Sequence, residues 1–146
     1  MANNLDQSAE EFLLLMDKMR QIGPQTAPPK EAKISLSQLA LIIFSANNPG
    51  CGIQAMAAGL KLSKPTVSIG VSQLEAAGFL TRQPDPQDGR AVKLFLTPKG
   101  EELHQDTKKF RCKKYKLLLT SLSPQERTTL LDLLKRAIHA AEQEIN

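Results

Sequence analysis

The sequence predicts a mainly α-helical protein with one small β-hairpin. Apolar residues recur at helical spacing in six separate stretches, most of them bounded by a cap or a turn signal. Two short strand patterns, Phe79–Arg82 and Ala91–Leu96, flank a loop rich in proline, aspartate and glycine, as in an antiparallel hairpin. The helix before them, from Ser63 to Gly78, begins with small polar residues. A polar-tipped helix followed by a hairpin indicates a winged helix-turn-helix.

Length and composition limit the classes of function that the chain can have. The chain has 146 residues, of which 41% are hydrophobic, enough for a core but not for a separate enzymatic module. Its formal net charge of +4 suits a polyanionic partner. No apolar run approaches the ~18 residues needed to span a membrane, and the N-terminus is acidic, unlike a secretory signal. Two cysteines make no disulfide framework and fit a reducing cytoplasm.

Caps and prolines set the expected boundaries of the first helices. The first helix runs from about Leu5 to Ile22, and Gly23-Pro24 stops it. Residues 23–33 form a linker, since three prolines cannot lie inside a helix. Ser35 and Gln38 form a capping box for the second helix, and Ile53 to Gly59 is a short third one.

The later helices carry equally local signals. Ser63 caps the fourth helix, whose buried face is marked by Val67, Val71 and Leu74. The pair Thr97-Pro98 opens a long helix that ends near Leu119. The last helix begins at residues 123–126, SPQE, with a cap, a proline and a capping-box glutamate.

The first and the last two helices are apolar over a broad face. One small winged region cannot cover that much apolar surface. We therefore expect a single 146-residue domain with two lobes: a winged helix-turn-helix at residues 34–97 and a helical dimerisation lobe at residues 1–23 and 98–146. The helical lobe is expected to pack onto a second copy of the chain.

Four motifs in order resemble the MarR family of bacterial transcription regulators. They are residues 34–39 (ISLSQL), 56–68 (MAAGLKLSKPTVS), 74–82 (LEAAGFLTR), and the wing signature at residues 85–90 (DPQDGR) followed by residues 96–100 (LTPKG). The resemblance implies an obligate homodimer that binds a pseudo-palindromic double-stranded DNA operator. It also implies, in many members, a small-molecule or redox input. We therefore expect a sequence-specific, DNA-binding transcription regulator, a repressor rather than an activator.

The candidate DNA contacts lie on the fourth helix and the hairpin. Short hydroxyls, a lysine and free backbone N–H groups at a helix start can bind bases or phosphates. We expect Arg90, at the wing tip, to enter a groove, with Asp88 holding its guanidinium in one rotamer. Arg82 is expected to contact a phosphate or a partner within the domain. The full candidate set is Ser63, Lys64, Pro65, Thr66, Ser68, Ser72, Gln73, Arg82 and Arg90.

Two positions depart from the family pattern. Ile69 stands where many members have a basic residue, and Gly70 where many have a large apolar one. Another basic residue is common near Gln73. Base recognition is therefore expected to depend more on the polar helix start and the wing. A glycine within a helix costs about 1 kcal/mol relative to alanine, so Gly70→Ala is expected to stabilise the fold, provided that a methyl group fits.

Other residues suggest weaker hypotheses. Residues 108–116 hold six basic residues, which form either a solvated helix face or a source of long-range attraction for DNA. Cys51 and Cys112 are redox candidates, against the commoner alternative of two unreactive thiols. The two histidines, His104 and His139, are too far apart for a zinc motif, and no metal or other cofactor is expected. No catalytic motif appears, which predicts that the protein is not an enzyme.

An alternative from a different class remains open on the sequence. The same fold could be a winged-helix protein–protein interaction module with little DNA binding. Ile69, Gly70 and Gln73 favour that alternative, whereas the basic wing residue and the net charge favour a DNA-binding regulator.

Overall fold

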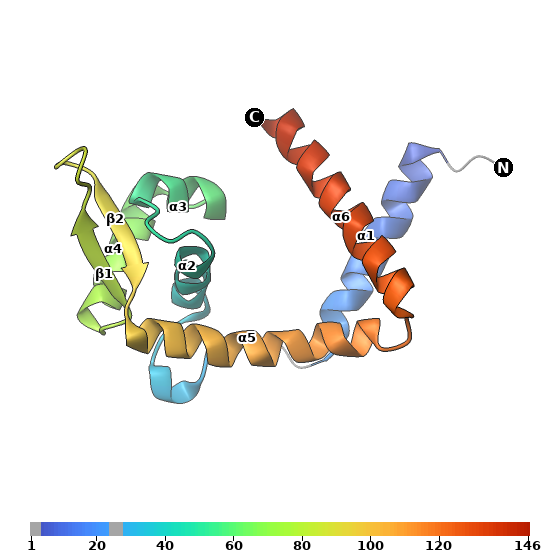
Figure 1. The fold of residues 1–146 in the computed structure, drawn as a ribbon, viewed down its shortest axis with the longest axis horizontal. Helices are drawn as coiled ribbons and strands as arrows, with labels where there is room; N and C mark the ends of the chain where they lie inside the picture. The colour runs from blue at the N-terminus through green and yellow to red at the C-terminus, as the bar shows by residue number, and fades with distance from the viewer. Residues whose placement is uncertain (1–3, 24–27) are drawn as a thin grey trace. The chain divides into compact units, whose positions relative to one another are not determined.

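A computed structural model describes residues 4–23 and 28–146 of the chain (Figure 1). In order, the elements are α1 (Leu5–Gln21), a 3₁₀ turn η1 (Lys30–Ala32), α2 (Leu36–Asn47), α3 (Ile53–Leu60), α4 (Lys64–Ala76), β1 (Leu80–Pro84), β2 (Val92–Leu96), α5 (Pro98–Leu119) and α6 (Pro124–Ile145). The predicted fold class, mainly helical with one small hairpin, is confirmed. None of the helices in the described ranges is long and apolar enough to cross a membrane.

The described residues form two compact units. Residues 28–110 make up the winged unit, and residues 4–23 with 111–146 make up the helical unit. The division falls inside α5, between Phe110 and Arg111, whereas the expected lobe boundary lay at residue 97. The N-terminal part of α5 groups with the winged unit, where it buries Leu103 and Thr107.

The core of the winged unit lies between α2, α3, α4 and the hairpin. Its central side chains are fully buried and come from every one of these elements: Ile42, Met56, Val67, Val71, Leu74 and Leu94. At roughly 1.5–3 kcal/mol per buried aliphatic side chain, this cluster is the main source of stability of the unit. It also fixes which face of α4 points outward.

The helix starts follow the local signals of the sequence. In α2 the Ser35 N–H donates to Gln38 Oε1 (2.9 Å), and the Gln38 N–H donates to Ser35 Oγ (3.1 Å), which confirms the capping box. The same reciprocal pair joins Ser123 and Glu126 at the start of α6. Each box satisfies two backbone groups that a helix end would otherwise leave unpaired.

The hairpin pairs β1 and β2 in antiparallel register, with Leu80 opposite Leu96 and Pro84 opposite Val92. Both strands differ slightly from the prediction. β1 begins one residue later than expected and continues to Pro84, and β2 begins one residue later, at Val92. Leu94 faces the core. The sequence did not predict a further contact on β2: the segment before α3 adds an isolated bridge, in which the Leu94 N–H donates to the Cys51 carbonyl at 2.9 Å.

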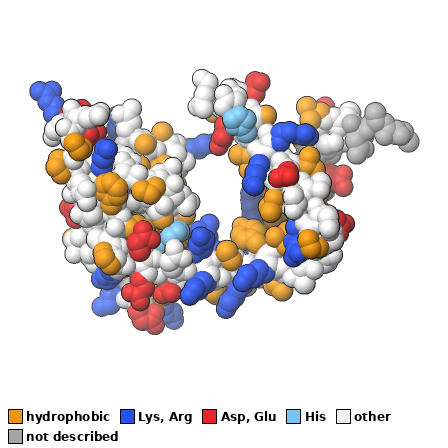
Figure 2. Space-filling view, in the orientation of Figure 1, with side chains coloured by type: hydrophobic (Ala, Val, Ile, Leu, Met, Phe, Trp, Pro, Cys, Tyr) orange, Lys and Arg blue, Asp and Glu red, His pale blue; other side chains and the backbone are white. Residues whose placement is uncertain are grey.

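The helical unit has almost no core of its own. Neither α1 nor α6 contains a buried residue. Large apolar side chains of the unit are exposed instead, among them Leu5, Phe12, Leu13, Leu14, Leu15, Leu117, Leu130, Leu131, Leu133 and Ile138. Figure 2 shows apolar side chains, in orange, on the surface of this unit. Such a surface is unusual for a chain that stays alone in water.

The segment between α1 and α2 differs in part from the expected linker. The 3₁₀ turn at Lys30–Ala32 lies within it, and the turn ends at Lys33 in a left-handed conformation (φ 54°). The first proline of the segment, Pro24, lies outside the described residues.

Candidate nucleic-acid interface

The buried face of α4 determines which of its side chains are available to a ligand. Val67, Val71 and Leu74 are fully buried, as the spacing predicts. Ile69 is 61% exposed. Ile69 therefore lies on the outer face of this helix.

The first turn of α4 presents polar groups to solvent. The Thr66 N–H donates to Ser63 Oγ at 3.2 Å, and the two hydroxyl oxygens lie 2.7 Å apart. Only one of the two hydroxyl hydrogens is used between them, so the other stays available to a base or a phosphate. Lys64 and Pro65 are exposed beside them, and Ser68 is half-buried one turn further on. Backbone N–H groups at this end of the helix also favour an anion.

Gln73 connects α4 to α2 rather than standing free. The Gln38 side-chain amide donates to Gln73 Oε1 at 2.9 Å. The bond crosses a shallow groove of about 200 Å³ between the start of α2 and α4. The groove is lined by Ser35, Ser37, Gln38, Leu41, Leu62, Thr66, Ile69, Gly70 and Gln73.

Arg82 is held inside the winged unit. Its guanidinium donates to Ser72 Oγ at 2.8 Å, and its Nε lies 3.6 Å from Glu75 Oε2. Two roles were expected for Arg82, a phosphate contact or a contact within the domain. The structure shows the contact within the domain. These contacts fasten β1 of the wing to the last turns of α4 and engage Ser72 as well.

The acidic residues of the wing shape its loop. Asp85 Oδ1 accepts the Gln87 N–H at 2.9 Å, and Asp88 Oδ1 accepts the Arg90 N–H at 3.0 Å. These are turns in which a side chain replaces a backbone acceptor. The expectation that Asp88 holds the Arg90 guanidinium was wrong, because its carboxylate binds the Arg90 backbone, and the two described side chains form no ion pair. The Arg90 side chain extends from a shaped loop and is exposed.

Gly70 is a point of close approach between two helices. A Cβ built on it would lie 2.5 Å from Leu41 Cδ1, and Leu41 is buried on α2. The condition for a stabilising alanine, that a methyl group fits, is therefore not met. Glycine at this position lets α2 and α4 pack closely beneath the outer face of α4.

The two cysteines lie in different units. Cys51 is half-buried, and burial raises the pKa of its thiol, although a backbone hydrogen bond acts the other way. A raised pKa means less thiolate at neutral pH, which argues against a reactive Cys51. Cys112, on α5, is half-buried. No group of three or more potential metal ligands occurs in the part of the chain that the structure describes.

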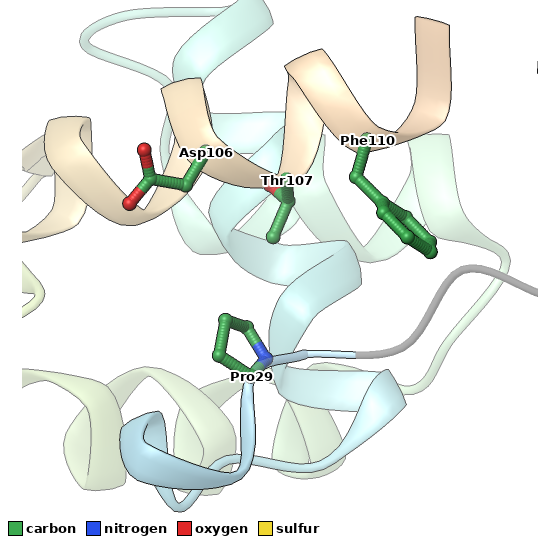
Figure 3. A pocket seen from close by; sticks show the side chains of 4 residues that line it. All are labelled: Pro29, Asp106, Thr107 and Phe110. Atoms are coloured by element: carbon green, nitrogen blue, oxygen red, sulfur yellow. The ribbon is translucent and has the colours of Figure 1, made fainter. Parts of the chain in front are cut away.

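A pocket of about 280 Å³ lies between α5 and the segment before η1 (Figure 3). Its lining residues are Pro29, Asp106, Thr107 and Phe110. Thr107 is buried, and its hydroxyl donates to helix carbonyls of Leu103 and His104, so the methyl side of Thr107 faces Pro29 (Figure 3). The sequence did not predict this pocket, because Pro29 and Thr107 are 78 positions apart.

The basic run of residues 108–116 lies on α5. Lys and Arg side chains are spread along the middle of this helix, as Figure 2 shows in blue. Most of these side chains are exposed, which matches the expected solvated face. No ion pair within the described ranges neutralises Lys108, Lys109 or Lys116.

Together, a helix-turn-helix (α3 and α4) and a two-stranded wing in one unit define a winged helix-turn-helix protein. A profile of the MarR family matches residues 34–92. The chain belongs to the MarR family.

Similar proteins are transcription regulators. The chain is 35% identical over 60% of its length to the uncharacterized HTH-type transcriptional regulator YkoM of Bacillus subtilis, of which it spans 58%. It is 30% identical over 66% of its length to the uncharacterized HTH-type transcriptional regulator Mb0904 of Mycobacterium bovis, of which it spans 68%.

Among solved structures, the fold resembles that of Streptococcus pneumoniae FabT in complex with DNA. The TM-score is 0.63 and the identity 22%, over 93% of this chain and 92% of FabT. A crystal structure of MarR itself gives a TM-score of 0.66 at 20% identity, over 99% of this chain and 96% of that one.

Proposed function

We propose that this protein is a cytoplasmic transcription repressor that binds a pseudo-palindromic DNA operator as a homodimer. The observation that carries the proposal is the joint presentation, by one compact unit, of the polar first turn of α4 and the exposed Arg90 of the wing. A helix of this kind enters the major groove, and a wing arginine reaches the backbone or the adjacent minor groove. The FabT structure, which contains DNA, supports the same use of the fold.

The candidate residues divide into two roles. Direct DNA contacts are assigned to those with exposed or half-exposed polar groups near the helix start and at the wing tip, namely Ser63, Lys64, Thr66, Ser68 and Arg90. Pro65 is assigned to the same contact surface because it is exposed in the first turn of α4. Ser72, Gln73 and Arg82 are assigned to holding the wing and α2 against α4, because their side chains are already hydrogen-bonded to one another or to α2.

A binding titration tests the proposal. Fluorescence anisotropy with the DNA immediately upstream of the protein's own coding region, at several salt concentrations, should reveal tight binding that weakens as salt rises. Arg90→Ala should weaken operator binding by about 1–3 kcal/mol, as expected for the loss of a groove contact. Gln87→Ala is the matched control, since Gln87 is exposed on the same loop and uncharged. Equal affinity of wild type and Arg90→Ala for every duplex would favour the interaction-module alternative.

The dimer rests on the exposed apolar surface of the helical unit. Side chains such as Phe12, Leu13, Leu130 and Leu133 have no core to join within one chain. Each such side chain, if buried in a partner, contributes roughly 1.5–3 kcal/mol. Analytical ultracentrifugation at micromolar concentration should give a dimer of the 16.0 kDa chain. A stable, folded monomer under those conditions would refute this part of the proposal.

A small-molecule effector is the remaining part of the proposal. The pocket at Pro29, Thr107 and Phe110 is apolar with one carboxylate at its edge, and it is close to the lower end of the usual size for a ligand site. BpsR of Bordetella bronchiseptica, a protein of similar fold, is regulated in DNA binding by 6-hydroxynicotinic acid. Redox control through Cys112 stays a weaker alternative.

A further inference from the structure

Ile69 points away from the core on the outer face of α4. At 3.6 residues per turn, it lies about 190° around the helix from the mean direction of Val67, Val71 and Leu74. Those three side chains are fully buried, so the rotation of α4 is fixed. Ile69 is accordingly 61% exposed, and it lies about one and a half turns from the start of α4.

The side chains beside Ile69 on α4 are mostly polar, and Leu41 and Leu62 line the same groove. Thr66 and Gln73 flank it on the side of α2, and Ser68 and Ser72 on the other. None of these four side chains is larger than glutamine, and the next residue is Gly70. Ile69 is therefore the large apolar side chain that α4 exposes on its outer face.

The chemistry of Ile69 limits what it can contact on DNA. An isoleucine side chain has no hydrogen-bonding group, so phosphates and the polar base edges offer it nothing. The apolar group that B-DNA displays in its major groove is the 5-methyl group of thymine. Because a β-branched side chain is stiff at χ1 in a helix, little rotamer freedom is lost when Ile69 is covered.

We propose that Ile69 recognises a thymine through its 5-methyl group, and that each operator half-site carries a thymine opposite this residue. The inference rests on the proposed DNA binding by α4 and adds a base preference to it. Ile69 then contributes specificity, where a basic residue would contribute a phosphate contact without sequence information.

The test removes the methyl group from the DNA. A tight-binding duplex is first selected from a randomised pool with the full-length protein. Each symmetry-related pair of thymines is then replaced by deoxyuridine, which keeps base pairing and lacks only the methyl group. At one symmetry-related pair of thymines, replacement of one thymine should weaken binding about fourfold, and replacement of both should weaken it about fifteenfold. The burial of one methyl group contributes about 0.8 kcal/mol, which corresponds to the fourfold change.

Protein variants assign the effect to Ile69. In Ile69→Ala the uracil penalty at that pair should fall below about twofold, whereas Ile69→Val, which keeps both γ-carbons and lacks only the δ-methyl group, should retain most of it. Leu36→Ala is the control, because Leu36 is an equally exposed apolar residue (61%) at the start of α2. Its uracil penalty should equal that of the wild type. Thermal melting of each variant establishes that it is folded.

The outcomes separate the inference from the proposed function. A uracil penalty that is absent in the wild type, or equal in wild type and Ile69→Ala, overturns the role of Ile69 and leaves DNA binding intact. If the pool yields no duplex that the wild-type protein binds, the proposed function fails, and the inference fails with it. A penalty lost only in Ile69→Ala supports the inference.

Discussion

Replacement of Gly70 by alanine tests the packing of α2 against α4. The added Cβ would lie 2.5 Å from Leu41 Cδ1, about 1 Å closer than the usual 3.5–4.0 Å carbon contact. Overpacking of this kind costs about 1–3 kcal/mol. Helix propensity returns about 1 kcal/mol when glycine becomes alanine. Because Leu41 is only 3% exposed and its δ-carbon would have to shift toward the groove that it lines, we expect a net loss of up to about 2 kcal/mol.

Thermal unfolding measures this loss. At about 2–4 °C per kcal/mol for a chain of this size, the Tm of Gly70→Ala should fall by up to about 8 °C. All variants must be compared at one protein concentration, since the Tm of the proposed dimer would depend on it. Gly89→Ala is a control, because no atom lies within 4 Å of a Cβ built at Gly89, and its Tm should stay close to that of the wild type.

A double-mutant cycle identifies the atom responsible. Leu41→Val removes the δ-carbons of Leu41 and should by itself cost about 1 kcal/mol. In that background Gly70→Ala should become neutral or slightly stabilising, which gives a coupling of about 2 kcal/mol between the two positions. A rise in Tm for Gly70→Ala alone, or strict additivity of the two changes, would refute the assignment of Gly70 to close helix packing.

Two further predictions concern charged residues. Lys64→Ala should weaken specific and non-specific DNA binding alike and reduce the salt slope by about one unit, as for one lost phosphate contact; an unchanged slope in the anisotropy titration would remove Lys64 from the interface. The Ser123 N–H and hydroxyl lower the pKa of the Glu126 carboxyl below its ordinary value of 4.5. The ionised carboxylate therefore stabilises the folded state at pH values above 4.5, and this stabilisation is lost as the pH falls through the lowered pKa. Glu126→Gln keeps the capping box and should flatten the acid limb of the Tm-against-pH curve relative to the wild type, and an identical acid limb would contradict this role.

The sequence by itself determined the features that depend on near neighbours in the chain. The sequence predicted the exact residues of the capping boxes at Ser35 and Ser123 and of the buried face of α4. These features involve groups only three or four positions apart. The exposure of Ile69 followed from the same periodicity. The order of the family motifs along the chain likewise predicted that α4 is followed by the hairpin and then by α5.

Only the tertiary structure decided the features that join distant parts of the chain. The sign of the Gly70→Ala effect depends on Leu41, 29 positions away, and the partner of Gln73 is Gln38, 35 positions away. Asp88 was assigned to the wrong group of Arg90, because a side chain that is two residues from its partner can bind either backbone or side chain. Pattern and propensity describe one element at a time, and they do not contain the distance between two helices or the path of a loop. Packing sets both, and it alone decided that Ser72 and Gln73 of α4 are hydrogen-bonded within the winged unit.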